Sequence, residues 1–138
     1  MNWQPMTIDG KVRGFEARLP RLHFFFGTRS TSKRDLEEYF PHYKFCFLKQ
    51  VHGAQIVSAN PHDTQQADGH FTSQIGQALV IQTADCLPIL LASGSQVFAL
   101  HAGWRGVAQN IVGSCKSFLK SPPLVSAIGP HIQKESFE

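Results

Sequence analysis

Short apolar runs separated by polar, glycine-containing or proline-containing segments recur along this chain. The clearest pair is Leu87–Ala92 and Val97–Leu100, which are joined by Ser93-Gly94-Ser95-Gln96. Glycine and serine between two apolar runs predict the turn of a β-hairpin. Antiparallel pairing then places Cys86, at the entry of the first strand, beside His101, at the exit of the second.

Other apolar runs predict further strands. The expected strands are Leu22–Gly27, Tyr43–Leu48, Ala54–Ser58, Ala78–Gln82 and Leu124–Ile128. Asp9-Gly10 is a turn signal that predicts either a weak N-terminal hairpin or a loose arm. Ala67–Thr72 is interpreted as a turn.

Two segments have helical features. Ser32, with Asp35 three residues on, forms a capping pattern, and Pro41 ends the helix that follows. Gly103–Lys120 carries apolar residues at helical spacing, which predicts one amphipathic helix. Strands with interleaved helices indicate a mixed α/β (α+β) domain.

Composition narrows the class of protein. With 138 residues, 42% of them hydrophobic and 17% charged, we expect one globular domain over residues 1–138. The net charge of +3 comes without a long basic run, so nucleic-acid binding has no support. Neither a signal peptide nor an apolar stretch of about 20 residues is visible, so we expect no membrane partner and a cytoplasmic location.

The three cysteines are an odd number at irregular spacing, which argues against a disulfide framework. Cys46 lies in an apolar strand and Cys115 on the apolar side of the expected helix, so both are assigned to the core. Cys86 stands between Asp85 and Leu87-Pro88, and from its spacing alone core packing and a functional role are both open.

A third candidate joins the pair at the hairpin ends. His52 lies between two strand-like segments and is followed by Gly53, which permits an unusual backbone angle. Two histidines and one cysteine suit a catalytic zinc site, which typically has three protein ligands and one open position. Copper is less suitable, because blue-copper sites add a weak axial ligand such as methionine, and the methionines are Met1 and Met6, far from these motifs.

Four motifs in order resemble the YfiH-like or laccase-domain family, first labelled multicopper polyphenol oxidase and now described as zinc-dependent purine nucleoside phosphorylase with adenosine deaminase activity. Some bacterial members are called peptidoglycan editing factor. The motifs are Gln50–Gly53, Ala67–Gly69, Thr83–Pro88 and His101–Gly106, with weaker similarity at Phe26–Arg29 and Ile128–Pro130. The resemblance implies mixed sheets packed with helices in a layered α/β/β/α architecture. It also implies that the segment after Arg29 is abbreviated here and that family members continue beyond the equivalent of Glu138. The chain is then either a truncated or naturally short version, or the missing part is supplied by another chain.

The resemblance further implies roles for individual residues. Zinc would be held by His52, Cys86 and His101, which form the catalytic group together with Asp85, a base or an orienting residue. Purine nucleoside and phosphate would be the small-molecule partners, and exposed sheet edges make a homo-oligomer a candidate assembly. The residues assigned to substrate binding are Arg29, Gln50 and Arg105, whose guanidinium suits phosphate.

Two other hypotheses remain open. In a metal-free cysteine hydrolase or deamidase, Cys86 would be the nucleophile and His101 its base. In a binding module of the same fold, the metal group would persist without turnover. The remaining assignments are structural: Trp104 is expected to pack, and surface or strand positions are expected for His23, His42, His62 and His70.

Overall fold

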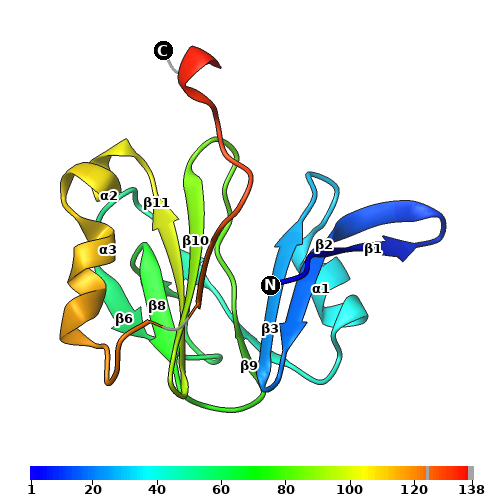
Figure 1. The fold of residues 1–138 in the computed structure, drawn as a ribbon, viewed down its shortest axis with the longest axis horizontal. Helices are drawn as coiled ribbons and strands as arrows, with labels where there is room; N and C mark the ends of the chain where they lie inside the picture. Colours follow the sequence, from blue (N-terminus) through cyan, green and yellow to red (C-terminus); the bar gives the residue numbers. More distant parts are fainter. Residues whose placement is uncertain (124, 137–138) are drawn as a thin grey trace. The chain divides into compact units, whose positions relative to one another are not determined.

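The computed structural model describes residues 1–123 and 125–136, and the chain divides into two compact units, Met1–His42 and Tyr43–Glu138 (Figure 1). Each unit is built from β-strands with a few short helices. The predicted mixed α+β class is therefore confirmed. The single domain expected over residues 1–138 stays a prediction, and the two units are described separately.

The first unit is a three-stranded antiparallel sheet in the order β1-β2-β3. Its strands are β1 (Gln4–Ile8), β2 (Lys11–Leu19) and β3 (Leu22–Gly27). Asp9 and Gly10 link β1 to β2 with φ angles of 52° and 73°. Two consecutive positive φ angles are typical of the tight turn of a hairpin, which confirms the prediction at these residues.

The helix of this unit is α1 (Lys33–Tyr39), and it begins as predicted. The Ser32 hydroxyl accepts from the Asp35 backbone N–H, and the Asp35 carboxylate accepts from the Ser32 backbone N–H at 2.7 Å. This reciprocal pair satisfies two of the amide donors that a helix leaves free at its start. Just beyond the helix, Phe40 packs edge-on against Phe25 of β3, with ring centroids 5.2 Å apart.

The second unit contains a five-stranded sheet in the order β12-β10-β11-β8-β6. Its strands are β6 (Ile56–Ser58), β8 (Gly69–Thr72), β10 (Leu87–Ser93), β11 (Gln96–Ala102) and β12 (Val125–Ile128). The β10–β11 hairpin confirms the pattern-based prediction, and β12 confirms the last strand for its described residues. Leu124, the first residue of that expected strand, lies outside the described residues.

Two short parallel pairs complete the strands of this unit. β4 (Lys44–Cys46) pairs with β9 (Gln77–Leu79), and β5 (Leu48–Lys49) pairs with β7 (Gln65–Gln66). The strand predicted at Tyr43–Leu48 is thus split at Phe47, because its two halves pair with different partners.

The turn expected at Ala67–Thr72 is wrong, because Gly69–Thr72 forms β8, an internal strand of the sheet. A Cβ atom at Gly69 would lie 2.7 Å from Leu100 Cδ2 and 3.0 Å from Ile56 Cγ1. Glycine here permits close packing between neighbouring strands rather than a turn. Long-range pairing with β6 and β11 therefore overrides the local turn signal.

The single helix expected over Gly103–Lys120 is also wrong. The segment forms α2 (Trp104–Ala108), α3 (Ile111–Ser114) and a 3₁₀ turn, η1 (Cys115–Ser117). Asn110 interrupts it with a left-handed φ of 58°, and its side-chain oxygen caps the Gly113 N–H. Asparagine tolerates this conformation better than most residues. None of the helices in the described part of the chain has the length and apolar character needed to cross a membrane.

The core of the second unit lies where these short helices pack against one face of the five-stranded sheet (Figure 1). Phe98 and Leu100 of β11 meet Ile111 and Cys115 from the helical segment, and all four are buried. Burying a large apolar side chain stabilises a fold by roughly 1.5–3 kcal/mol. Cys115 and the fully buried Cys46 are free thiols, which confirms their assignment to the core.

His70 lies in a strand, as expected, but it is completely buried rather than at the surface. Its partners on the adjacent strands are Val57 and Ala99. Neither ring nitrogen has a hydrogen-bond partner among the described residues. Burial lowers the pKa of His70 to about 4, and this effect exceeds the opposing influence of the nearby Val80 backbone. The folded protein therefore holds this imidazole in the neutral form.

We predict that His70 makes the folded state sensitive to mild acid. Its unfolded pKa of 6.5 exceeds its folded pKa of about 4, so its stabilising effect is complete above pH 6.5 and declines as the pH falls toward 4. Between pH 7 and pH 4.5, the wild type should lose about 2–3 kcal/mol more unfolding free energy than a His70→Leu variant. Urea denaturation at both pH values measures this difference. Equal losses in the two proteins would contradict it, and the exposed His62, changed to leucine, is the control.

Candidate metal centre

The hairpin brings Cys86 and His101 together. Leu87 of β10 pairs with Ala102 of β11, and Pro88 pairs with His101. Cys86 directly precedes β10, and His101 is the second-last residue of β11, so both lie at the same end of the hairpin. The local geometry expected from the apolar pattern is therefore present.

His52 reaches the same place through an unusual backbone conformation. The residue adopts φ 61°, in the left-handed region that costs a non-glycine residue energy. We expected Gly53 to provide such an angle, and this is a correction, because His52 itself adopts it. Strain of this kind persists only where the surrounding structure holds it in place.

Asp68 is the residue that holds this loop. Its Oδ1 accepts hydrogen bonds from the Val51 and Gly53 backbone N–H groups at 3.0 and 2.9 Å. Its Oδ2 accepts from the His52 backbone N–H at 2.9 Å. Three consecutive amide donors thus converge on one carboxylate and compensate for the strained angle at His52.

The same carboxylate orients His101. Asp68 Oδ2 lies 2.6 Å from His101 Nδ1, and both side chains are buried. Burial alone would raise the pKa of Asp68, but hydrogen bonds from His101 and the three backbone groups hold it below its ordinary value. An ionised carboxylate can only accept, so Nδ1 is the donor, and in the neutral imidazole Nε2 would then carry the free lone pair. A carboxylate behind a histidine is typical of metal sites.

The three predicted ligands converge. The potential ligand atoms of His52, Cys86 and His101 all lie within 4.8 Å of one another, and the two imidazole rings are 4.8 Å apart at 77°. In a tetrahedral zinc site with bonds of about 2.0–2.3 Å, the ligand atoms lie about 3.3–3.8 Å apart, so an inward movement of about 1 Å would close the group on one ion. Gly103 lies directly against it, because a Cβ there would be 3.2 Å from Cys86 Sγ and 3.3 Å from His52 Cδ2. The donor set and its carboxylate support therefore fit a zinc ion.

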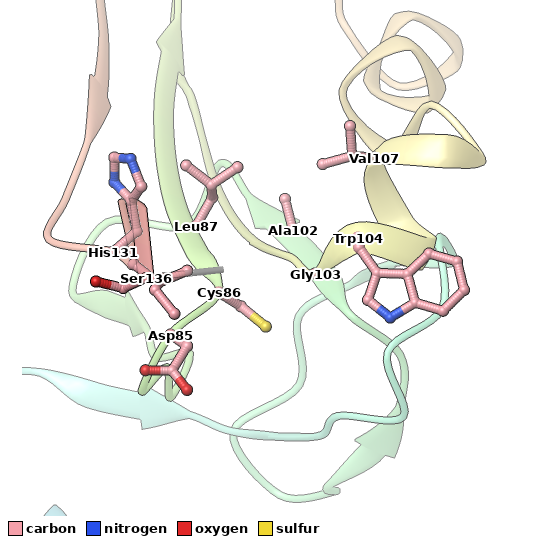
Figure 2. Close-up of a pocket in the computed structure, with 10 residues that line it drawn as sticks. Asp85, Cys86, Leu87, Ala102, Gly103, Trp104, Val107, His131 and Ser136 are labelled. Carbon is pink, nitrogen blue, oxygen red and sulfur yellow. The ribbon is translucent and has the colours of Figure 1, made fainter. Parts of the chain in front are cut away.

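A pocket of about 700 Å³ opens beside Cys86 (Figure 2). This volume falls in the usual range for small-molecule sites. The lining residues are Asp85, Cys86, Leu87, Ala102, Gly103, Trp104, Val107, His131, Ile132 and Ser136. The segment after β12 forms one wall of the pocket. Two backbone hydrogen bonds of 2.9 Å hold it in place: the Gly129 N–H donates to Pro88 O in β10, and the Ile132 N–H donates to Asp85 O just before β10.

The electrostatic setting of Cys86 favours the thiol over the free thiolate. Burial raises its pKa, and the negative charges of Asp85 and Asp68 raise it further. A metal-free nucleophilic cysteine needs the opposite shift. A cation at the site would reverse this preference, because a coordinated thiol is deprotonated.

The other predicted site residues are placed less directly. Asp85 is exposed and lines the pocket. The Gln50 amide donates to Gln82 O and accepts from Gln82 N–H, both at 2.7 Å, so it holds the segment that leads to Cys86. The Arg105 guanidinium lies over the Trp104 ring, 5.2 Å from its centroid. Arg29 is an exposed residue of the first unit. The roles of these four residues stay predictions.

Sequence reasoning missed two residues. Asp68 was recognised only as part of the Ala67–Gly69 motif, and its four donors lie 15 to 33 residues away in the chain. The only available signal was an acidic residue beside an otherwise buried strand. Trp104 was expected to pack, but its side chain is 66% exposed at the pocket.

The chain is similar to a known protein family, to several named proteins and to solved structures. The family described as multi-copper polyphenol oxidoreductase laccase matches residues 30–138. A purine nucleoside phosphorylase of Rickettsia conorii is 37% identical over 114 residues, which cover 78% of this chain and 48% of that protein. A purine nucleoside phosphorylase of Pseudomonas aeruginosa is 41% identical over 96 residues, which cover 67% of this chain and 40% of that protein.

Among solved structures, a Neisseria meningitidis protein superposes with a TM-score of 0.68 at 28% identity. The match covers 76% of this chain and 46% of that one. The chain thus spans about half the length of the relatives that it matches.

We predict that Asp68→Asn destabilises the second unit and weakens metal binding together. The amide cannot accept from all four donors, so buried N–H groups lose their partner at a cost of about 3 kcal/mol at pH 7. Because the folded pKa of Asp68 lies below 3.8, this difference persists at neutral pH and shrinks only as the pH falls through that folded value. Denaturation and zinc titration measure the two effects, with Asp63→Asn, an exposed aspartate, as the control. A variant with wild-type stability and affinity would contradict the assignment.

Proposed function

This chain belongs to the multi-copper polyphenol oxidoreductase laccase family, and on that premise we propose that it acts as a zinc-dependent purine nucleoside phosphorylase with adenosine deaminase activity. The substrate class is purine nucleosides, including adenosine, inosine and methylthioadenosine, together with phosphate. A cytoplasmic location and homo-oligomeric assembly are parts of the same proposal.

The observation that carries the proposal is the convergence of His52, Cys86 and His101, of which Cys86 also lines a pocket of about 700 Å³. The names of the relatives from Rickettsia conorii and Pseudomonas aeruginosa support the purine substrate class. Zinc is preferred to copper because a multicopper cluster needs many more histidines than this site offers. The His52–Cys86–His101 group is the one potential metal-binding group among the described residues. Met1 and Met6, the only methionines, belong to the other unit.

Each residue of the site has a physical task in this proposal. Zinc, when bound, supplies Lewis-acid chemistry and lowers the pKa of a coordinated water from 15.7 toward 7. Asp68 fixes the His101 ring so that Nε2 faces the group, and Gln50 fixes the approach to Cys86. Asp85 offers an exposed carboxylate at the pocket, suited to accept a proton or to orient a ligand. The guanidinium groups of Arg29 and Arg105 are assigned to phosphate.

The metal-free cysteine hydrolase is the rival proposal. Asp68, His101 and Cys86 lie in the order of an orienting acid, a base and a nucleophile, which is the arrangement that such chemistry uses. Two observations favour zinc instead. The pKa of Cys86 is raised rather than lowered, and the rival gives no role to His52.

A binding module without turnover is the third proposal, in which the His52–Cys86–His101 group and the pocket beside Cys86 hold a ligand without catalysing a reaction. Calorimetric titration with inosine, run beside a turnover assay, separates binding from catalysis.

His52→Ala is the substitution that best distinguishes the zinc enzyme from its metal-free rival. Loss of a ligand should remove stoichiometric zinc and reduce inosine phosphorolysis and adenosine deamination at least about 100-fold. Metal content by mass spectrometry and both turnover assays provide the readouts. His62→Ala, which changes another exposed histidine, should leave all three unchanged.

Cys86→Ala should give the same losses of zinc and activity. A His52→Ala protein that keeps full activity while Cys86→Ala is inactive would support the cysteine hydrolase. Full activity in both variants would refute the two enzyme proposals for this site.

A further inference from the structure

Trp104 is an exposed aromatic side chain at a functional pocket. It is the first residue of α2, its side chain is 66% exposed, and it lines the pocket next to Cys86. An exposed indole leaves a large apolar area in water, which folding alone does not favour. Aromatic side chains in this position are typical of ligand-binding surfaces.

The backbone ties Trp104 closely to the metal group. Its neighbour Gly103 is so near that an added Cβ would lie 3.2 Å from Cys86 Sγ and 3.3 Å from His52 Cδ2. In Figure 2, the Cys86 sulfur points toward the side of the pocket where the indole stands, while Asp85, His131 and Ser136 lie on the other side. A ligand in contact with the indole is therefore held beside the metal group.

The two faces of the indole have different surroundings. The Arg105 guanidinium lies over the ring at 5.2 Å from the centroid, and Arg105 is absent from the pocket lining formed by the described residues. One face thus carries a cation, and the indole-bearing residue itself contributes to the pocket lining. The walls near it are apolar, with Leu87, Ala102 and Val107 among the lining residues.

A flat, rigid, apolar face beside apolar walls selects a flat aromatic partner. Ribose and phosphate carry hydroxyl groups and charge that such a wall cannot satisfy, whereas a nucleobase presents a π-face. Stacking of a base on an aromatic side chain contributes about 1–3 kcal/mol, which corresponds to about a 5- to 140-fold change in affinity.

We propose that Trp104 is the specificity-determining residue that stacks on the purine ring of the nucleoside and sets it beside the His52–Cys86–His101 group. This inference rests on the proposed nucleoside substrate. It assigns the base to the Trp104 side of the pocket and leaves the polar side, with Asp85 and His131, to the sugar.

The chain contains two tryptophans, and this makes a direct optical test practicable. Trp3 packs against Phe26 within the first unit, with ring centroids 5.1 Å apart and the rings tilted by 30°. In a Trp3→Phe protein, Trp104 is the sole indole emitter. Saturable quenching of its fluorescence by inosine, with none by ribose 5-phosphate at equal concentration, is the expected result.

Substitutions in the same Trp3→Phe background test the energetic contribution. Trp104→Leu should weaken inosine binding about 5- to 140-fold by calorimetry and raise KM with little change in kcat, because stacking contributes equally to the ground and transition states. Trp104→Phe, which keeps an aromatic face, should recover much of the affinity. Zinc content should be unchanged in both variants, which separates a role in base binding from damage to the metal group.

The outcomes distinguish this inference from the proposed function. Phosphorolysis of inosine with wild-type KM in Trp104→Leu, and without quenching of Trp104, would overturn the stacking role while the proposed function stands. A wild-type protein that neither binds nor turns over inosine would overturn the proposed function and the stacking role together. Quenching by ribose 5-phosphate equal to that by inosine would overturn recognition of the base.

Discussion

The buried negative charge of Asp68 is the constraint on which the site depends. A carboxylate without solvent is tolerated only when its oxygens are satisfied, and here four N–H donors converge on them. Three of these donors fix the loop that carries His52, and the fourth fixes the ring of His101. One side chain therefore couples a strained loop to the end of a sheet strand. Because both histidines depend on it, neither can be displaced without cost to the other.

The charges around Cys86 determine whether its thiol or its thiolate is favoured. Burial and two nearby carboxylates raise the pKa of the Cys86 thiol, so without a cation the site disfavours the reactive thiolate. The same negative surroundings favour a divalent cation, whose binding deprotonates the sulfur. The electrostatics around Cys86 thus favour a bound cation over a free thiolate nucleophile. This is the physical reason to rank metal chemistry above cysteine chemistry.

Local features of the chain were readable from the sequence, and long-range ones were not. The β10–β11 hairpin followed from two apolar runs and a glycine-containing turn, and it correctly placed Cys86 beside His101. The α1 cap and the Asp9-Gly10 turn were similarly local. Asp68 escaped notice because its partners are distant in sequence, and β8 looked like a turn because Gly69 is a packing residue. Asn110 interrupts the expected helix because its backbone is left-handed. The spacing of apolar residues does not predict such a backbone angle.

The pairing of Pro88 with His101 has a consequence for how the sheet assembles. Side chains alternate between the two faces of a strand, so a slip of one residue between β10 and β11 would carry His101 to the opposite face of the sheet. A slipped hairpin would therefore lose both the Asp68 contact and the third ligand. A cation bound at this end of the hairpin would therefore favour the correct strand alignment, because only the correctly aligned chain brings His52, Cys86 and His101 together.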